Sequence, residues 1–273
     1  MSMIENEHPF EDVDGSGVAP HLVAYLEAVA ALPEVKAVHD AATAMLRPRP
    51  GERVLEVGCG LGADARELAH AVAPDGGVTA VDVSEAMLNA ARERHDGSNV
   101  TYERADVTAL PYDDGMFDAV RVERVLQHVV DVERACAEMA RVLKPGGRLL
   151  ALDTDWGSLA IEAAGDDDLV ERCLAHAKSR FIQPRAALRL RRLLTTAGLT
   201  DVDLRPTAFG YTRLHDAATL IPMANDGLPA EADFVPRADR DAWFQALRDA
   251  DTNGTFFAGW TAYTALGYKP RVG

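Results

Sequence analysis

The chain has few cysteines, few aromatic residues, fewer basic than acidic residues and no long apolar run. The cysteines, Cys59, Cys136 and Cys173, are too few and too scattered for a disulfide framework or a metal cluster, so we expect no metal site. Without a run of about 18 apolar residues, the sequence predicts no membrane span and no membrane partner. The acidic start has no apolar segment typical of a signal peptide, and a cytoplasmic location is therefore expected.

The excess of acid limits the class of partner. Lys and Arg together number 28 against 43 Asp and Glu, which gives a formal net charge of −15. That charge repels nucleic acid on average, so we expect no nucleic-acid partner. The stretch 183–192 is locally basic, but its leucines indicate a packed helix with a solvated charged face. A polyanion site there remains the less favoured alternative.

Apolar runs and helical patterns alternate along most of the chain. Hydrophobic residues make up 48% of 273, enough to bury one large core. Strands are predicted at 53–58, 77–82, 100–105, 117–122, 148–155, 201–211 and 254–269. Helices are predicted at 18–32, 34–46, 63–73, 85–94, 131–143, 167–180, 185–197 and 238–250. This alternation is typical of an α/β protein whose mostly parallel sheet has helices on both faces.

Three parts of the chain are expected to have different roles. Residues 1–49 are predicted to form a helical segment that covers a ligand site. Residues 50–212 and 253–273 are predicted to form the α/β core. The connection 213–252 is long for a link inside a compact domain, and we interpret it as a lid or substrate-pocket insertion.

The stretch "VLEVGCGLGADA", residues 54–65, is the first functional signal. Gly58, Gly60 and Gly62 follow an apolar strand and precede a helix, a place where bare backbone lets a ligand approach the main chain. The spacing from Gly58 to Ala63 formally fits the dinucleotide fingerprint, with Asp82 at a suitable distance for a ribose hydroxyl. A nicotinamide-dependent oxidoreductase is therefore one hypothesis.

Further motifs favour another ligand. Glu56 precedes the glycines, Asp82 closes "VTAVDVS", "RADVTALPYDDGMFDAV" follows the third strand, and "RVLKPGGRL" precedes the fifth. In this order and spacing they resemble the class I S-adenosylmethionine-dependent methyltransferases, especially the small-molecule branch that acts in ubiquinone and menaquinone biosynthesis. The resemblance covers roughly residues 50–155. It implies a Rossmann-like, seven-stranded, mostly parallel sheet with an antiparallel last strand.

The resemblance also implies which residues hold S-adenosylmethionine. Glu56 would assist the methionine ammonium, Asp82 would accept from the ribose hydroxyls, and Asp106 would accept from the adenine amino group. The whole predicted cofactor set is Glu56, Gly58, Gly60, Gly62, Asp82, Val83, Met87, Ala105, Asp106, Val107 and Glu123. Structural alternatives stay open: Glu56 could pair with an arginine, Asp82 could cap the next helix, and Asp106 could close a turn.

Methyl transfer is a displacement at carbon, in which orientation supplies most of the catalysis. A base is needed only when the acceptor must lose a proton. His128 is the favoured base by residue type and Asp155 the second candidate. Their structural alternatives are a histidine that fixes a turn and an aspartate that caps a helix.

The acceptor is expected to be a small organic molecule, of natural-product or cofactor type. The predicted substrate-pocket residues are Trp156, Tyr211, His215, Phe256 and Trp260. An aromatic pocket of this kind suits a flat or apolar ligand. A non-catalytic methyltransferase-like partner subunit is a third hypothesis, and the oligomeric state is left open, with a homodimer as one option.

Overall fold

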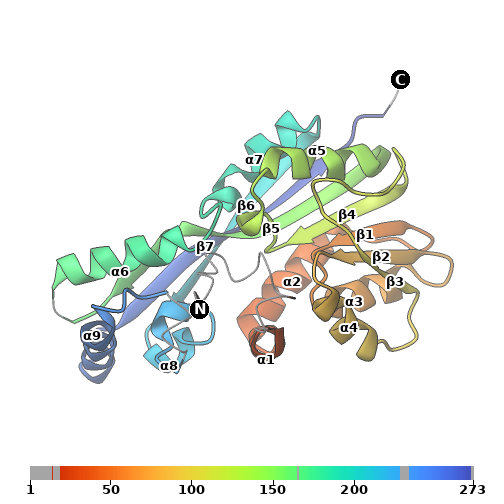
Figure 1. Cartoon of the computed structure of the whole chain (residues 1–273). Coiled ribbons are helices and arrows are strands. Elements are labelled where there is room, and N and C mark those ends of the chain that lie inside the picture. Colours follow the sequence, from red (N-terminus) through yellow and green to blue (C-terminus); the bar gives the residue numbers. More distant parts are fainter. Residues whose placement is uncertain (1–13, 15–18, 165, 228–233, 272–273) are drawn as a thin grey trace, which may run out of the picture.

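A computed structural model of the chain describes residue 14 and residues 19–164, 166–227 and 234–271. In these residues seven strands form one sheet with the order β3-β2-β1-β4-β5-β7-β6. The strands are β1 Arg53–Val57, β2 Gly77–Asp82, β3 Val100–Arg104, β4 Phe117–Glu123, β5 Leu143–Glu162, β6 Thr200–Tyr211 and β7 Phe257–Tyr268. Strand β7 runs antiparallel to both neighbours, and the other pairings are parallel (Figure 1).

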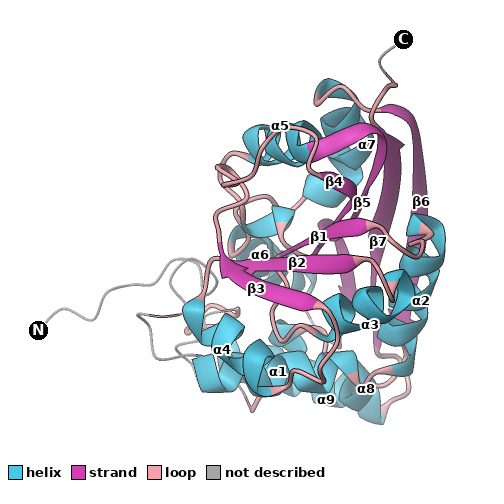
Figure 2. Ribbon diagram, turned by 90° about the vertical axis from the view of Figure 1, so that its right-hand side faces the viewer, coloured by secondary structure: helices cyan, strands magenta, loops and turns pink. Residues whose placement is uncertain are grey.

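Helices pack on both faces of the sheet, as Figures 1 and 2 show. One face carries α2 Pro33–Leu46, α3 Ala63–Val72 and α4 Glu85–Glu93, with α1 Ala19–Ala30 beside α4. The other face carries α5 Val132–Val142 and α7 Ala186–Thr196, with the short η1 Leu126–His128 after β4. Beyond the far ends of β5, β6 and β7 lie α6 Asp167–Ser179, α8 Leu214–Ala217, η2 Pro222–Ala224 and α9 Arg240–Thr252.

The buried side chains form three clusters that follow this layering. One lies between the sheet and α5 and α7, and another lies between the sheet and α2 and α3. The third joins the extended ends of β5 and β7 to α6, α8, η2 and α9, with the fully buried Trp243 in it. The residues of this third cluster pack together beside the carboxyl ends of the parallel strands. Ligands bind at these strand ends in such folds.

The sequence-based fold class is confirmed, and each predicted strand and helix is found, most of them with shifted ends. The main difference is β5, predicted at 148–155 and observed over 20 residues, Leu143–Glu162. Beyond an irregularity after Asp155 it pairs again with β7, and Leu159 and Ile161 alternate into the third cluster. That alternation is short and interrupted by Gly157, so the pattern alone does not show the extension.

The segment 213–252 folds as α8, η2 and α9 between β6 and β7. Its residues 228–233 lie outside the described part of the chain, as do residues 1–13 and 15–18 of the predicted N-terminal segment. Among the described residues, no helix combines the length and apolarity that crossing a membrane requires.

Candidate cofactor and acceptor site

The loop after β1 holds its three glycines in left-handed backbone conformations. Gly58, Gly60 and Gly62 have φ angles of 70°, 49° and 71°. A Cβ on Gly58 would lie 2.1 Å from Cγ2 of Val125, whereas one on Gly60 would meet, among the described residues, Leu26 of α1 at 3.6 Å. Packing within the protein itself therefore requires glycine at 58, and Gly60 is where bare backbone faces α1. The contact of either glycine with a cofactor stays a prediction.

Asp82, at the end of β2, fastens the glycine loop to the start of α4. Its Oδ2 accepts a hydrogen bond from Gly60 N–H and its Oδ1 one from Ser84 N–H, each at 3.0 Å. Burial raises the pKa of Asp82 above its ordinary value. Asp106 closes the turn after β3, accepting from the backbone and hydroxyl of Thr108 at 2.8 Å. Asp106 thus has the structural role that the sequence left open, whereas Ser84 and not Asp82 caps α4. Both carboxylates keep lone pairs for a ligand.

The apolar residues predicted beside the adenine differ in exposure. Val83 is 47% exposed, while the side chains of Met87 and Val107 are 3% and 5% exposed. Only Val83 of these three offers a large open apolar surface at the end of β2. Ala105 lies directly after β3, and its backbone N–H donates to the carbonyl of Asp82, which brings the ends of β2 and β3 together.

Five charged residues from four elements meet below the glycine loop. Arg121 is fully buried on β4 and donates to Glu56 at 2.7 Å, to Asp64 at 3.1 Å and to Glu123. His39 of α2 lies 3.3 Å from Asp64 and also hydrogen-bonds to Glu123. Glu56 therefore pairs with an arginine, which was the structural alternative to a role at the cofactor.

Arg124 adds a second guanidinium to the cluster, because its Nε lies 3.6 Å from Oε1 of Glu123. Three carboxylates thus face two guanidinium groups and one imidazole, and Oε2 of Glu56 has no hydrogen-bond partner among the described residues. Burial raises the pKa of Glu56 to about 8, against the pull of Arg121. Burial opposes protonation of His39, but hydrogen bonds with Asp64 and Glu123 raise the pKa of the imidazole to about 9. A hydrogen-bond donor of a ligand beside Oε2 of Glu56 would satisfy this buried oxygen.

His39, Asp64 and Glu123 also have a spacing that suits a metal ion, since their ligand atoms lie within 4.8 Å of one another. Arg121 already contacts two of the three, and its charge would oppose a metal cation. The expectation of no metal stays a prediction.

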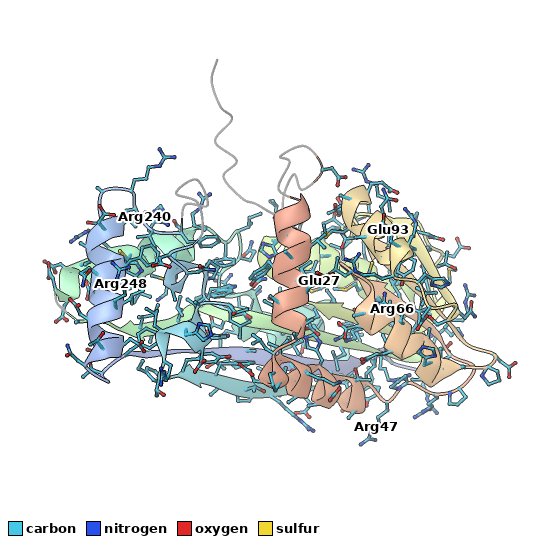
Figure 3. All side chains as sticks on the ribbon, turned by 90° about the horizontal axis from the view of Figure 1, so that it is seen from below. Glu27, Arg47, Arg66, Glu93, Arg240 and Arg248 are labelled. Atoms are coloured by element: carbon cyan, nitrogen blue, oxygen red, sulfur yellow. The ribbon has the colours of Figure 1, made fainter. Side chains whose placement is uncertain are left out.

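The two N-terminal helices lie against this region, as Figure 3 shows for α1, which runs across the middle of the molecule. Leu26 of α1 faces the glycine loop, and Glu27 forms an ion pair with Arg94 next to α4 at 2.6 Å. Glu34 of α2 accepts a hydrogen bond from the hydroxyl of Tyr211 at 2.5 Å. The helices thus link the glycine loop to the end of β6.

An aromatic stack borders the site on the other side. The rings of Phe181 and Trp156 lie 4.4 Å apart and within 10° of parallel, and those of Trp156 and Trp260 lie 6.5 Å apart at 14°. Phe209 and Tyr211 stack on Trp260 at 5.0 and 5.6 Å. Trp156, Tyr211 and Trp260, which the sequence predicts for the substrate pocket, therefore come together from three strands.

The short helix η1 connects this stack to the end of β4. The indole N–H of Trp156 donates to Oε1 of Gln127 at 2.6 Å, and Nε2 of His128 lies 3.0 Å from Nε2 of Gln127. The His128 ring is 6.0 Å from the ring of Phe181. The predicted base thus stands at the edge of the aromatic stack.

The second predicted base, Asp155, is buried in the irregular part of β5. It accepts a hydrogen bond from Gly157 N–H at 3.1 Å and lies 3.7 Å from Nε of Arg185. It therefore closes a turn within the strand. Asp153, which the sequence analysis did not single out, is fully buried, accepts from the N–H of Gln127 and Thr154, and burial raises its pKa to about 7.

The other two predicted pocket residues lie elsewhere. His215 is exposed on α8, and Phe256 is buried in the third cluster just before β7. Within the described ranges, no ring contact joins either residue to the stack. His215 and Phe256 are close in sequence to Tyr211 and Trp260, but they lie outside the strands that carry the stack.

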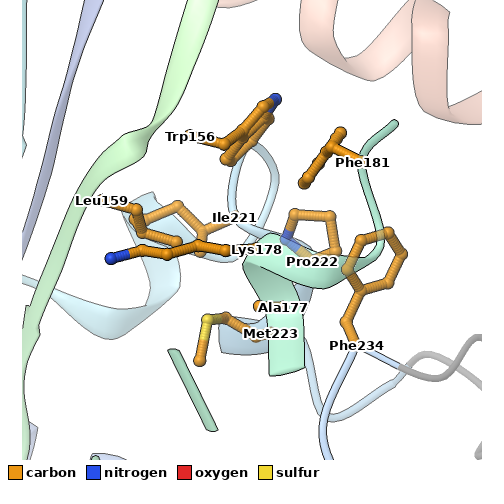
Figure 4. Close-up of a pocket in the computed structure, with 9 residues that line it drawn as sticks. All are labelled: Trp156, Leu159, Ala177, Lys178, Phe181, Ile221, Pro222, Met223 and Phe234. Carbon is orange, nitrogen blue, oxygen red and sulfur yellow. The ribbon is translucent and has the colours of Figure 1, made fainter. Parts of the chain in front are cut away.

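A small apolar hollow opens beside the stack, with a volume of about 10 Å³, which holds about one water molecule (Figure 4). Trp156 and Phe181 form one side of it, and side chains from β5, α6 and the segment 221–223 and Phe234 form the rest. Its lining residues are Trp156, Leu159, Ala177, Lys178, Phe181, Ile221, Pro222, Met223 and Phe234. Among the described residues that line it, Lys178 is the charged one.

Known proteins are similar to this chain in sequence and in fold. A family model described as a methyltransferase domain matches residues 55–151. An uncharacterized 37.1 kDa protein of a Streptomyces fradiae transposon is 33% identical over 250 residues, covering 90% of this chain and 71% of that protein. The ubiquinone/menaquinone biosynthesis C-methyltransferase of Saccharophagus degradans is 40% identical over 109 residues.

The chain belongs to the class I S-adenosylmethionine-dependent methyltransferases. The match to the Saccharophagus methyltransferase spans 38% of this chain and 44% of the relative. A phosphoethanolamine N-methyltransferase from Haemonchus contortus, solved with S-adenosylhomocysteine, shares the fold with a TM-score of 0.62 and 18% identity, over 97% of this chain and 60% of that one. S-Adenosylmethionine is therefore the cofactor, and the nicotinamide hypothesis is set aside.

The residues present fit this cofactor. The unpartnered oxygen of Glu56 matches a hydrogen-bond donor such as the ammonium of the methionine part. The glycine loop and Asp82 lie together at the carboxyl ends of β1 and β2, where the family binds the nucleoside. When bound, the cofactor supplies an electrophilic methyl group on a sulfonium, and the protein orients what meets it.

Several residues of this site escaped the sequence analysis. Arg121, His39 and Asp64 come from separate elements, and only Arg121 carried a signal, as a basic residue between two valines of a predicted strand. Lys178 lies in α6 and Phe181 lies just after it, and this part of the sequence matched no motif. Nothing in their spacing to Trp156 predicts that they share a hollow.

Proposed function

We propose that this methyltransferase transfers a methyl group to a small, flat, largely apolar acceptor. The aromatic stack carries the proposal, because Phe181, Trp156 and Trp260 form a wall beside η1, which follows directly after Glu123 and Arg124 at the end of β4. Stacked rings bind flat ligands by dispersion and by excluding water. The relative in ubiquinone and menaquinone biosynthesis is named for C-methylation, and for this chain the methylated atom is left open.

The roles at the cofactor follow from the site. Glu56, helped by Glu123, would hold the ammonium, and Asp82 would accept from the ribose hydroxyls beside the Gly60 amide. Asp106 would accept from the adenine amino group through the oxygen that does not bind Thr108. Val83 would lie against the nucleoside with its exposed side chain.

Catalysis is proposed to rest mainly on orientation, with His128 as the base when the acceptor must lose a proton. His128 is preferred to Asp155, because Asp155 is buried in the turn at Gly157. The segment 213–252 is proposed to shape the acceptor pocket, since Ile221, Pro222 and Met223 line the hollow.

A screen for methylated products tests the proposal. Purified enzyme with S-adenosylmethionine is offered phenols, quinols and indoles together with their saturated ring analogues, and products are detected by mass spectrometry. We expect methylation of aromatic members and a loss of roughly tenfold or more in kcat/KM for Trp156→Ala. Phe257→Ala, which removes an exposed aromatic outside the stack, is the control and should keep the rate. Equal turnover of flat and saturated analogues would refute the proposal that the acceptor is flat.

A further inference from the structure

Arg124 lies directly after β4, at the carboxyl end of the strand, in a backbone conformation that is uncommon for a residue with a side chain. Its φ angle of 52° is left-handed. Two hydrogen bonds hold it there, since its N–H donates to the carbonyl of Leu152 at 2.9 Å and its carbonyl accepts from the side-chain amide of Gln127 at 3.3 Å. Strained residues cluster at ligand sites, which makes the Arg124 side chain a candidate contact.

The guanidinium of Arg124 is only partly engaged by the protein. Its Nε forms an ion pair with Glu123 at 3.6 Å, which is too long for a hydrogen bond, and the side chain is 29% exposed. Within the described ranges, none of its five N–H groups donates a hydrogen bond. A planar guanidinium in this state can bind a carboxylate through two parallel hydrogen bonds.

Arg124 also lies close to the glycine loop and to two further elements. The next residue, Val125, packs against Gly58. Burial raises the pKa of Tyr25 on α1, and the charge of Arg124 opposes that rise. Burial likewise raises the pKa of Asp153 on β5 to about 7, against the effect of its backbone hydrogen bonds and of Arg124. The guanidinium therefore lies among groups from α1, β4 and β5 at the end of the sheet that carries the cofactor motif.

The amino-acid end of S-adenosylmethionine carries an ammonium and a carboxylate on the same carbon. The charge cluster offers a partner for each of them, the unpartnered Oε2 of Glu56 and the guanidinium of Arg124. Arg121 links the two, because it donates to both Glu56 and Glu123. Three carboxylates face three basic groups here, and such a balanced cluster suits a zwitterion better than a lone cation or a lone anion.

We propose that Arg124 binds the carboxylate of the methionine part of the cofactor, while Glu56 accepts from the ammonium. The inference rests on the proposed place of that ammonium, and it adds a cofactor residue that lies outside the glycine motif. It makes Arg124 the residue that distinguishes ligands with a carboxylate from ligands without one. The competing structural explanation is that Arg124 only balances the charges of Glu123 and Asp153.

The test compares three ligands by calorimetry: S-adenosylhomocysteine, the aminopropyl thioether of adenosine, which lacks the carboxylate, and the carboxypropyl thioether, which lacks the ammonium. We expect the wild type to bind S-adenosylhomocysteine at least about tenfold more tightly than the aminopropyl ligand. Arg124→Met should remove this preference. Arg124→Lys should keep part of it, because lysine supplies the charge without the planar fork. Arg192→Met is the charge-matched control, because Arg192 is exposed on α7 and pairs with Glu133, and it should keep the preference.

Two outcomes would overturn the inference. Equal binding of S-adenosylhomocysteine and the aminopropyl ligand by the wild type, or binding of none of the three ligands, would do so without use of any variant. A preference that survives in Arg124→Met would show that the arginine only balances charge.

The carboxypropyl ligand separates this inference from the proposed place of the ammonium. Arg124→Met should weaken its binding by about tenfold, whereas Glu56→Gln should reduce the preference for S-adenosylhomocysteine over it. If Glu56→Gln leaves that preference unchanged while Arg124→Met removes the preference for a carboxylate, the place of the ammonium is wrong and the role of Arg124 stands.

Discussion

Glu56 shows how one side chain can serve both the fold and the cofactor. One of its oxygens accepts from Arg121 and the other has no partner among the described residues. Since burial keeps its pKa near 8, the carboxyl is largely protonated at pH 6 when no cation is near the free oxygen. An ammonium beside it favours the ionised form, so cofactor binding is linked to proton release.

The affinity for S-adenosylmethionine should therefore rise with pH between about 5.5 and 7, where the ligand's own ammonium stays charged. The affinity should rise by nearly tenfold per pH unit in the wild type, and it should depend much less on pH in Glu56→Gln. Calorimetry across this pH range measures the affinity of both proteins. Glu67→Gln, on the exposed side of α3, is the control and should follow the wild type. A slope that is unchanged in Glu56→Gln would remove Glu56 from the binding linkage.

At the scale of elements, a largely buried histidine helps to hold α2 against the core. His39 bridges Asp64 at the start of α3 and Glu123 at the end of β4. Its pKa of about 9 lies above the ordinary value of 6.5, so the folded state binds the proton more tightly than the unfolded chain does. The stabilisation is complete below pH 6.5 and disappears as the pH rises through 9.

We expect the wild type to lose roughly 1–3 kcal/mol of unfolding free energy between pH 6.5 and 9.5 through this contact. His39→Gln should be less stable than the wild type at pH 6.5 and should lose less as the pH rises. Urea unfolding followed by tryptophan fluorescence measures the difference. His70→Gln, whose side chain is exposed and paired with Asp96, is the matched control with a small expected effect. Parallel pH profiles for wild type and His39→Gln would contradict this account.

The elements also show what local sequence can predict. The strands and helices of the core were predictable because their apolar residues repeat at the period of each structure, and the glycine loop and Asp82 were predictable because the cofactor motif is continuous. The charge cluster was not, since Arg121, Asp64 and His39 meet only after three elements pack. The extension of β5 was missed because its pairing with β7 depends on residues about 100 positions away.

At the scale of the whole molecule, different elements border the proposed cofactor region and the proposed acceptor region. The N-terminal helices lie against the glycine loop, and α6, η2 and the aromatic stack stand beyond β4 and β5. The candidate cofactor residues come from the shared family core, whereas the acceptor residues come from β5 onwards. The sequence could predict the first group by resemblance. It predicted only Trp156, Tyr211 and Trp260 of the stack, because Phe181 reaches them through tertiary packing alone.

The central claim is that the cofactor binds at the glycine loop through Asp82, and binding of S-adenosylhomocysteine to Asp82→Ala tests it most directly. Loss of a charge-assisted acceptor costs about 1.5–3 kcal/mol, so affinity should fall at least tenfold. The control is Asp75→Ala, which removes an exposed carboxylate located just before β2. This variant should bind S-adenosylhomocysteine as tightly as the wild type does. Calorimetry should also show no binding of NAD to the wild type. Unchanged affinity in Asp82→Ala, or comparable binding of NAD, would contradict the account.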